Sequence, residues 1–144
     1  GGDTTMYLNL LDRELLSDTQ ELPYPGPLLR VNLTTGNVEE QVEARHQMPF
    51  DVKVNSRTGR IFHVFTESNT LAQFDPSRNR WAYFNTERYG IETPYGLADI
   101  PGTKLMAING FHDGIALFDT SNMLMEQKFE TKNFGIKHMV FEAT

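Results

Sequence analysis

The sequence predicts an all-β fold built from a repeated unit of four strands. Three local patterns carry this prediction, and they recur in the same order along the 144 residues. In the first pattern, an apolar strand ends in Asn or Asp before a turn, at Asn32, Asp75 and Asp119, which are 43 and 44 residues apart. Asn and Asp suit this place because their side chains accept hydrogen bonds from backbone N–H groups of the following turn. A shared period indicates a structural repeat.

The other two patterns follow the same period. A strand opened by an aromatic residue occurs in PFDVKV from Pro49, in PYGLAD from Pro94 and, more loosely, in FGIKHM from Phe134. A turn with Gly precedes an apolar strand in TGRIFHVF, PGTKLMAI and GGDTTMYL. The 10 Phe and 5 Tyr also favour strands, since aromatic side chains pack well on a pleated surface. Four strands in roughly 40–45 residues are typical of a β-propeller blade.

The repeats predict two complete blades and one blade split between the termini. The first spans residues 45–88, the second spans 89–130, and the split blade joins 131–144 to 1–44. The strands of the two complete blades are expected near 50–54, 60–65, 71–75 and 80–85, and near 95–99, 104–109, 114–119 and 124–130. Those of the split blade are expected near 134–141, 5–10, 28–33 and 37–44, with a long insertion over 12–27. A helix over 8–16 also fits the apolar spacing, although nine residues without an N-cap form a marginal helix.

Three blades do not close a ring, because propellers use roughly four to eight blades. The chain is therefore expected either to pair with further blades of the same protein or to self-associate. In the second case, two copies would join head to tail into a six-bladed ring, with 134–141 of one copy completing the split blade of the other. The fragment is the favoured interpretation, and the first residues, Gly1-Gly2-Asp3, agree with a processed or excised piece.

Composition excludes several classes of function. The net charge of −6 argues against a nucleic-acid partner, which would require an excess of Lys and Arg on one face. Arg78 and Arg80 form a small basic pair that we interpret as a solvated feature of a turn. The chain has no Cys, so zinc–thiolate and iron–sulfur sites are excluded. No apolar run approaches the ~18 residues that a membrane span requires.

Several stretches resemble the repeats of the virginiamycin B (streptogramin) lyase family. The matching segments are Phe65-Thr66-Glu67, Gln73-Phe74-Asp75-Pro76 and Pro94-Tyr95-Gly96-Leu97. NHL-type propellers share much of this pattern, so the resemblance specifies the fold better than the activity. It implies a propeller and, if the activity is shared, a carbon–oxygen lyase with a Mg²⁺ ion near the channel mouth and a histidine base.

A ligand-binding face is expected where the loops between the second and third strands meet the connections between blades. The candidate residues on this face are His46, Glu67, Asn69, Tyr89 and Asp113. Carboxylates are ligands for Mg²⁺, so Glu67 and Asp113 are its candidate ligands, and His112 is the candidate base. The simpler interpretation, which we favour, is that Glu67 and Asp113 are solvated loop residues and that His112 caps a turn.

Three functions follow from these observations. The first is a propeller scaffold that binds a small molecule or a protein partner on its loop face, as a segment of a larger extracytoplasmic protein, periplasmic or secreted. The second is a Mg²⁺-dependent lyase that resembles streptogramin lyase. The third is the propeller part of a quinone- or haem-linked oxidoreductase. The residues themselves do not fix the compartment.

Overall fold

The computed structural model describes residues 5–9, 25–47, 49–66, 68–131 and 139 of the chain. These residues fall into two compact units, Gly1–Pro49 and Phe50–Thr144. The predicted insertion over 12–27 and the predicted strand over 134–141 lie largely outside the described residues.

The first unit contains one antiparallel sheet of three strands in the order β1-β2-β3. The strands are β1 (Thr5–Asn9), β2 (Pro25–Asn32) and β3 (Val38–Gln47). Strand β2 begins at Pro25, three residues before the predicted start, so the last residues of the expected insertion belong to a strand. Strand β3 extends to Gln47, which places the backbone of His46 in a strand instead of in a connecting loop.

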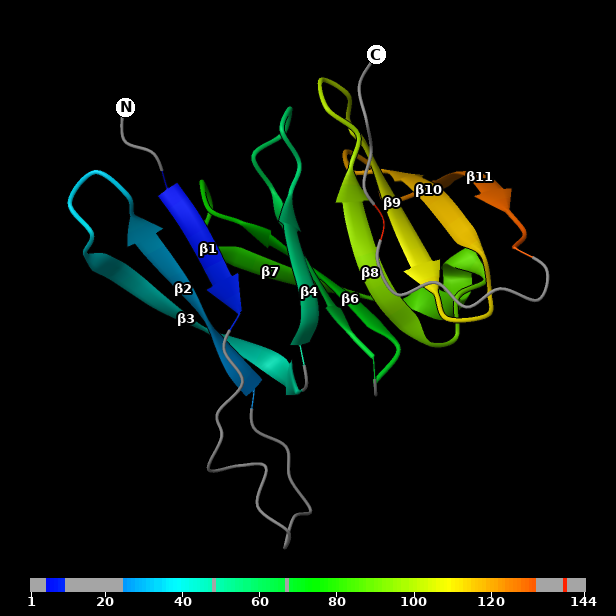
Figure 1. Ribbon diagram of the computed structural model, residues 1–144, viewed down its shortest axis with the longest axis horizontal. Coiled ribbons are helices and arrows are strands. Elements are labelled where there is room, and N and C mark those ends of the chain that lie inside the picture. Colours follow the sequence, from blue (N-terminus) through cyan, green and yellow to red (C-terminus); the bar gives the residue numbers. More distant parts are fainter. Residues whose placement is uncertain (1–4, 10–24, 48, 67, 132–138, 140–144) are drawn as a thin grey trace, which may run out of the picture. The chain divides into compact units, whose positions relative to one another are not determined.

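The second unit contains two four-stranded antiparallel sheets that follow one another along the chain (Figure 1). The first sheet consists of β4 (Pro49–Val54), β5 (Ile61–Phe65), β6 (Thr70–Asp75) and β7 (Arg80–Asn85). The second consists of β8 (Pro94–Asp99), β9 (Leu105–Gly110), β10 (Ile115–Asp119) and β11 (Met125–Phe129). Neighbours in sequence are neighbours in each sheet, because each strand pairs with the next through a short turn or loop.

The predicted all-β class is therefore confirmed, and the strand positions in both sheets agree with the sequence pattern to within one residue at nearly every end. Among the described residues the only helix is a single 3₁₀ turn, η2 (Thr86–Tyr89), between the two sheets. The sequence pattern did not predict this turn. It begins after Asn85, whose side chain accepts a hydrogen bond from the Glu87 backbone N–H, and it ends at Gly90 with φ of 73°.

One turn geometry recurs after β2, β6 and β10. The side-chain oxygen of Asn32, Asp75 or Asp119 accepts a hydrogen bond from the backbone N–H two residues later, at 2.8, 3.0 and 2.8 Å respectively. The fourth residue after each of them has positive φ: 77° at Gly36, 51° at Asn79 and 61° at Met123. The capping role predicted for Asn and Asp is thus present at all three positions.

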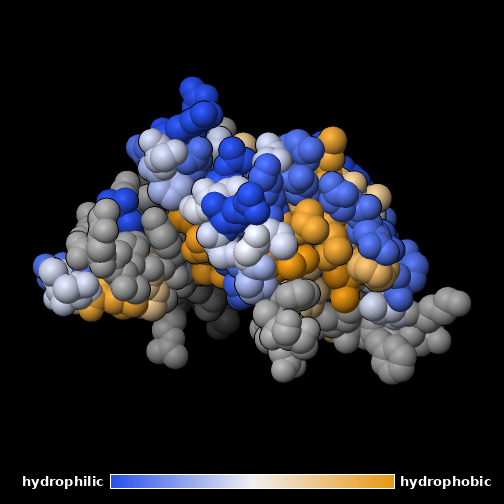
Figure 2. Space-filling view, turned by 90° about the horizontal axis from the view of Figure 1, so that it is seen from above, coloured by the Kyte–Doolittle hydropathy of each residue, from blue (hydrophilic) through white to orange (hydrophobic). Residues whose placement is uncertain are grey.

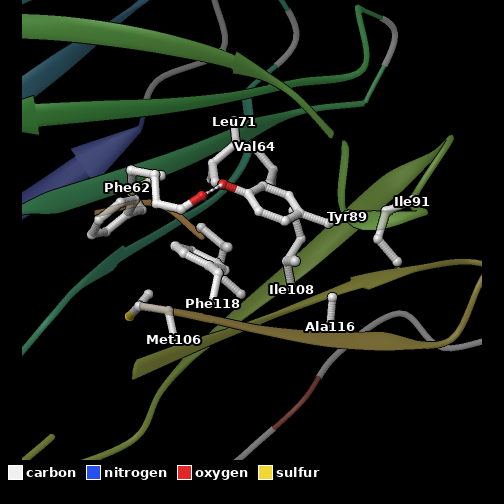
Figure 3. Close-up of a cluster of buried hydrophobic side chains, with 11 residues drawn as sticks. Phe62, Val64, Leu71, Tyr89, Ile91, Met106, Ile108, Ala116 and Phe118 are labelled. Carbon is white, nitrogen blue, oxygen red and sulfur yellow. Dashed lines mark hydrogen bonds between the residues drawn. The ribbon is translucent and has the colours of Figure 1, made fainter. Parts of the chain in front are cut away.

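The core of the second unit lies between its two sheets (Figure 3). Phe62, Val64 and Leu71 form what we call the front face of the first sheet. They pack on what we call the back face of the second sheet, which consists of Met106, Ile108, Ala116 and Phe118. The rings of Phe62 and Phe118 meet edge to face at 5.6 Å between centroids.

The two sheets present opposite faces to one another. Phe118 precedes the turn residue Asp119 just as Phe74 precedes Asp75, so these two phenylalanines hold matching positions. Phe118 packs on the first sheet. Gln73, the neighbour of Phe74, points toward the second sheet, because its side chain reaches Thr120. Since side chains alternate along a strand, Phe74 lies on the face of the first sheet that points away from the second. The stacking is therefore head to tail: the front face of one sheet meets the back face of the next.

Candidate functional site

Residues 66, 68 and 69, the loop 110–114 and the connection 86–93 meet at one end of the two sheets, which we call the loop end. The Thr66 hydroxyl donates a hydrogen bond to the Pro94 carbonyl at 2.7 Å, which joins the first loop to the start of β8. The carbonyl of Asn69 accepts a hydrogen bond from the Thr86 backbone N–H at 2.8 Å. These contacts hold the loop end together across sequence separations of 17 to 28 residues.

Four aromatic rings form a continuous row at the loop end, which we call the aromatic strip. It consists of Phe50 at the start of β4, Tyr95 at the start of β8, and Phe111 and His112 in the loop after β9. Successive ring centroids lie 4.8, 5.5 and 4.3 Å apart. Phe50 is 44% exposed, His112 is exposed, and the other two rings are half-buried. Such a row offers an apolar surface to a flat or apolar group, with a polar imidazole at one end.

The strip arises from the repeat. Phe50 and Tyr95 occupy the same place in successive sheets, since each follows the proline that opens the first strand. Head-to-tail stacking brings these matching strand starts together, and the Asp51 carboxylate of β4 accepts a hydrogen bond from the Leu97 N–H of β8 at 3.0 Å. The sequence pattern identified the opening aromatics but did not assign them to the ligand face.

The Asp113 carboxylate contacts the backbone of the connection that precedes β8. Its Oδ2 atom accepts hydrogen bonds from the backbone N–H groups of Glu92 at 3.0 Å and Thr93 at 3.4 Å. The carboxylate therefore fixes the connection that leads into β8. The neighbouring His112 ring is exposed and stands edge-on to Phe111.

Among the other predicted site residues, the structure describes the side chains of Tyr89 and Asn69. Tyr89 was expected on the ligand face, but its side chain is only 1% exposed, because the ring points into the core and stacks on Phe118 (Figure 3). Its hydroxyl donates a hydrogen bond to the Met123 carbonyl at 2.7 Å, and burial raises the pKa of Tyr89 to about 12. Asn69 is half-buried at the loop end, with φ of 51°. Glu67 lies outside the described residues, as does the side chain of His46.

No group of three or more His, Asp or Glu side chains within the described residues is placed to hold a metal ion. Of the two candidate Mg²⁺ ligands, only Asp113 lies within the described part of the chain, and its Oδ2 is engaged by the backbone.

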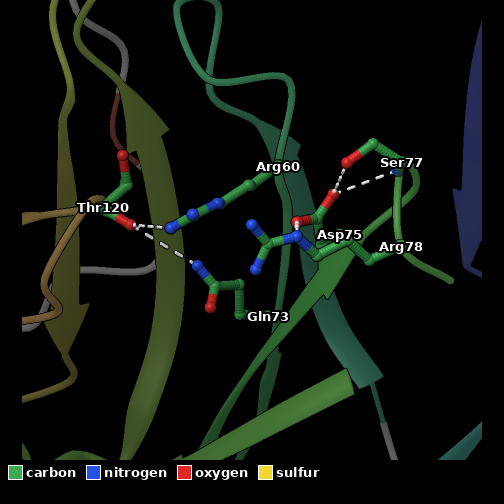
Figure 4. A network of polar contacts seen from close by, with 6 residues as sticks. All are labelled: Arg60, Gln73, Asp75, Ser77, Arg78 and Thr120. Carbon is green, nitrogen blue, oxygen red and sulfur yellow. Dashed lines mark hydrogen bonds and ion pairs between the residues drawn. The ribbon is translucent and has the colours of Figure 1, made fainter. Parts of the chain in front are cut away.

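A second polar site, which the sequence pattern did not indicate, lies at the opposite end of the first sheet, beside the turns after β4 and β6. A pocket of about 110 Å³ is lined there by Arg60, Gln73, Asp75, Arg78, Arg80, Trp81 and Ala82. Figure 4 shows the guanidinium groups of Arg60 and Arg78 and the amide of Gln73 converging on one space. Arg60 is 18 residues before Arg78 in the sequence, so only the β5–β6–β7 pairing reveals that they belong together.

Figure 2 shows hydrophilic residues over much of one face, interrupted in several places by hydrophobic ones. The large hydrophobic side chains that are exposed include Phe50, Val54, Leu124, Met125 and Phe129. Only Phe50 among them belongs to a row of contacting rings at the loop end.

No protein-family model matches the chain, and no curated protein matches it. In the described part of the chain, no helix has the length and apolar character needed to cross a membrane.

Proposed function

We propose that the chain is a segment of a β-propeller that binds a small molecule or a protein partner at its loop end. The propeller is supported by the head-to-tail stacking of the two sheets. A pair of sheets related by a two-fold axis would bring matching faces together, whereas successive propeller blades bring opposite faces together. The recurring turn after β2, β6 and β10 supports the same repeat.

The aromatic strip is the single observation that carries the binding function. Folding normally buries aromatic rings, and here four rings in contact remain partly or largely exposed at one end of the unit. Exposed aromatic clusters mark sites for ligands and partners, because they bury a large apolar area at a small cost in side-chain entropy. The strip spans two sheets, so it is assembled only when the repeat is folded.

An NMR screen with small uncharged aromatic compounds and neutral sugars tests this function. The expected result is that amide chemical shifts change in a saturable way as compound is added, and only in residues near Phe50, Tyr95 and the loop 110–114. Phe50→Ala should weaken the binding of the best compound by about tenfold, because the loss of one stacked ring costs roughly 1.5 kcal/mol of binding free energy.

Phe129→Ala is the matched control. Phe129 is 43% exposed, close to the 44% of Phe50, but it lies on β11 outside the strip. Equal losses of affinity in the two variants, or amide chemical-shift changes that spread over β11, would contradict a specific site at the loop end.

The two enzymatic alternatives gain no support of this kind. Oδ2 of Asp113 accepts hydrogen bonds from the Glu92 and Thr93 backbone, and no contact among the described residues favours the Mg²⁺-dependent lyase. Within the described part of the chain, no contact favours a quinone- or haem-linked oxidoreductase either.

A further inference from the structure

The pocket at the turn end of the first sheet has an excess of positive charge. Its lining contains three guanidinium groups, from Arg60, Arg78 and Arg80, and a single carboxylate, from Asp75. The local formal charge is thus +2, in a chain whose net charge is −6. An excess of this kind attracts anions, and it is independent of the aromatic strip at the other end of the strands.

Asp75 offsets only one of the three positive charges, and the turn occupies one of its two carboxylate oxygens. Its Oδ1 atom accepts hydrogen bonds from the Ser77 backbone N–H at 3.0 Å and from the Ser77 hydroxyl at 2.6 Å (Figure 4). The hydrogen bonds from Ser77 hold the pKa of Asp75 below its usual range. Its Oδ2 atom lies 3.8 Å from Nε of Arg78, whose side chain is 70% exposed.

The pocket also holds donors in fixed positions. Nη1 of Arg60 donates a hydrogen bond to the Thr120 carbonyl at 2.6 Å, and Nε2 of Gln73 reaches the same carbonyl at 3.4 Å (Figure 4). A guanidinium group carries five N–H donors, so most donors of Arg60 stay available to a ligand. The Arg80 guanidinium makes no hydrogen bond or ion pair with a described residue, and Trp81 supplies an apolar wall.

The second sheet provides an internal comparison. Its turn after β10 has the same hydrogen bonds, from the Ser121 backbone N–H and hydroxyl to Asp119 at 2.8 and 2.5 Å. Yet the residues that match Gln73, Arg78 and Arg80 there are Leu117, Asn122 and Leu124. The turn therefore forms without arginines, and the cluster in the first sheet is not a requirement of the fold.

We propose that this pocket binds a tetrahedral oxyanion, a phosphate or sulfate group. Arginine is suited to such a group, since its planar fork donates two parallel hydrogen bonds to two oxygens. Pockets for drug-sized ligands span about 300–1,000 Å³, so a hollow of about 110 Å³ suits one anionic group instead of a whole organic ligand. Arg60 and Gln73 are preorganised by Thr120, and Arg78 and Arg80 close on the anion from the exposed side.

Titration of the whole chain with inorganic phosphate, followed by NMR at constant ionic strength, tests the proposal. We expect saturable shifts of the Gln73 side-chain amide and of the Nε–H groups of Arg60, Arg78 and Arg80. Arg80→Gln should weaken phosphate binding by about tenfold, because one charge-assisted hydrogen bond contributes roughly 1.5 kcal/mol or more. Arg80 is exposed, and thermal unfolding of the variant should match that of the parent chain.

Arg57→Gln is the matched control, since it removes the same charge from an exposed arginine whose contact is with the Gly102 carbonyl, outside the pocket. It should leave the affinity for phosphate unchanged. Sulfate should compete with phosphate, and acetate should bind more weakly. Three results would each overturn the proposal: chemical-shift changes that do not saturate, a loss of phosphate affinity in Arg57→Gln equal to that in Arg80→Gln, or acetate binding as tight as that of phosphate.

Discussion

His63 is buried on the back face of the first sheet, among aromatic rings. It lies 5.8 Å from the ring of Phe65 and 5.5 Å from that of Trp81, and its side chain is 0% exposed. Neither ring nitrogen has a hydrogen-bond partner among the described residues. Burial lowers the pKa of His63 from 6.5 to about 4, although the Asp51 carboxylate acts in the opposite direction. The folded protein therefore keeps this imidazole neutral at pH values above about 4.

A lowered histidine pKa makes the fold sensitive to acid. As the pH falls from about 6.5 to about 4, the unfolded chain takes up a proton that the folded chain does not, so the free energy of unfolding decreases. For this shift the decrease is about 2 kcal/mol at pH 5. His63→Ile should remove this part of the pH dependence, because Ile108 holds the matching position in the second sheet. Urea unfolding at pH 7 and pH 5 measures the difference.

The control for this prediction is His112→Ala, which removes an exposed histidine. That variant should retain the loss of stability between pH 7 and pH 5. If His63→Ile lost as much stability over this interval as the parent chain, the burial of a neutral imidazole would not be the cause.

Individual side-chain environments were the least predictable part of the candidate site. The sequence placed Tyr89 in the right connection, but its register in η2 turns the ring into the core, and no local pattern signals a 3₁₀ turn there. Asp113 was expected either as a solvated residue or as a metal ligand, and it binds the backbone of a segment 20 residues away. The aromatic strip and the arginine pocket both depend on strand pairing, which a linear pattern does not contain.

At the scale of the element, the strands were predictable because three signals agreed. Alternating or continuous apolar runs marked the strands, and Asn and Asp marked the caps of their turns. Glycine marked several of the places where the backbone has positive φ, such as Gly59 and Gly114. The period separated one sheet from the next, because the turn residues Asp75 and Asp119 recur with the same hydrogen bonds. Where the sequence departs from the pattern, as between β1 and β2, the predicted boundary was less accurate.

Gly114 illustrates how strictly one turn position is specified. Its φ is 87°, and a Cβ atom there would collide with the carbonyl oxygen of Phe129 on the neighbouring strand. Gly114→Ala should therefore destabilise the second unit by about 3 kcal/mol, as the sum of backbone strain and a steric conflict in the β10–β11 pair. Thermal or urea unfolding measures this effect.

Gly59→Ala separates the two causes. Gly59 has φ of 71°, but a Cβ atom there has no neighbour within 4 Å. This variant should lose only the strain of a left-handed backbone, about 1 kcal/mol. Equal losses for Gly59→Ala and Gly114→Ala would show that the approach of Phe129 does not constrain the turn.

At the scale of the whole molecule, the central claim is that the two sheets of the second unit are successive copies of one repeat, stacked head to tail. This arrangement explains why the loop end collects matching residues such as Phe50 and Tyr95. It also explains why the turn end of the first sheet meets Thr120 of the second. The sequence period predicted the repeat itself, but which faces meet depends on packing across the core.

Nuclear Overhauser effects between aromatic side chains test this claim most directly. The account predicts cross-peaks between the ring protons of Phe62 and Phe118, whose centroids are 5.6 Å apart, and between Tyr89 and Phe118, at 5.4 Å. Phe74 should show contacts with Trp81, at 4.9 Å, and none with Phe118. Cross-peaks between Phe74 and Phe118 in place of those between Phe62 and Phe118 would mean that matching faces meet, and they would contradict head-to-tail stacking.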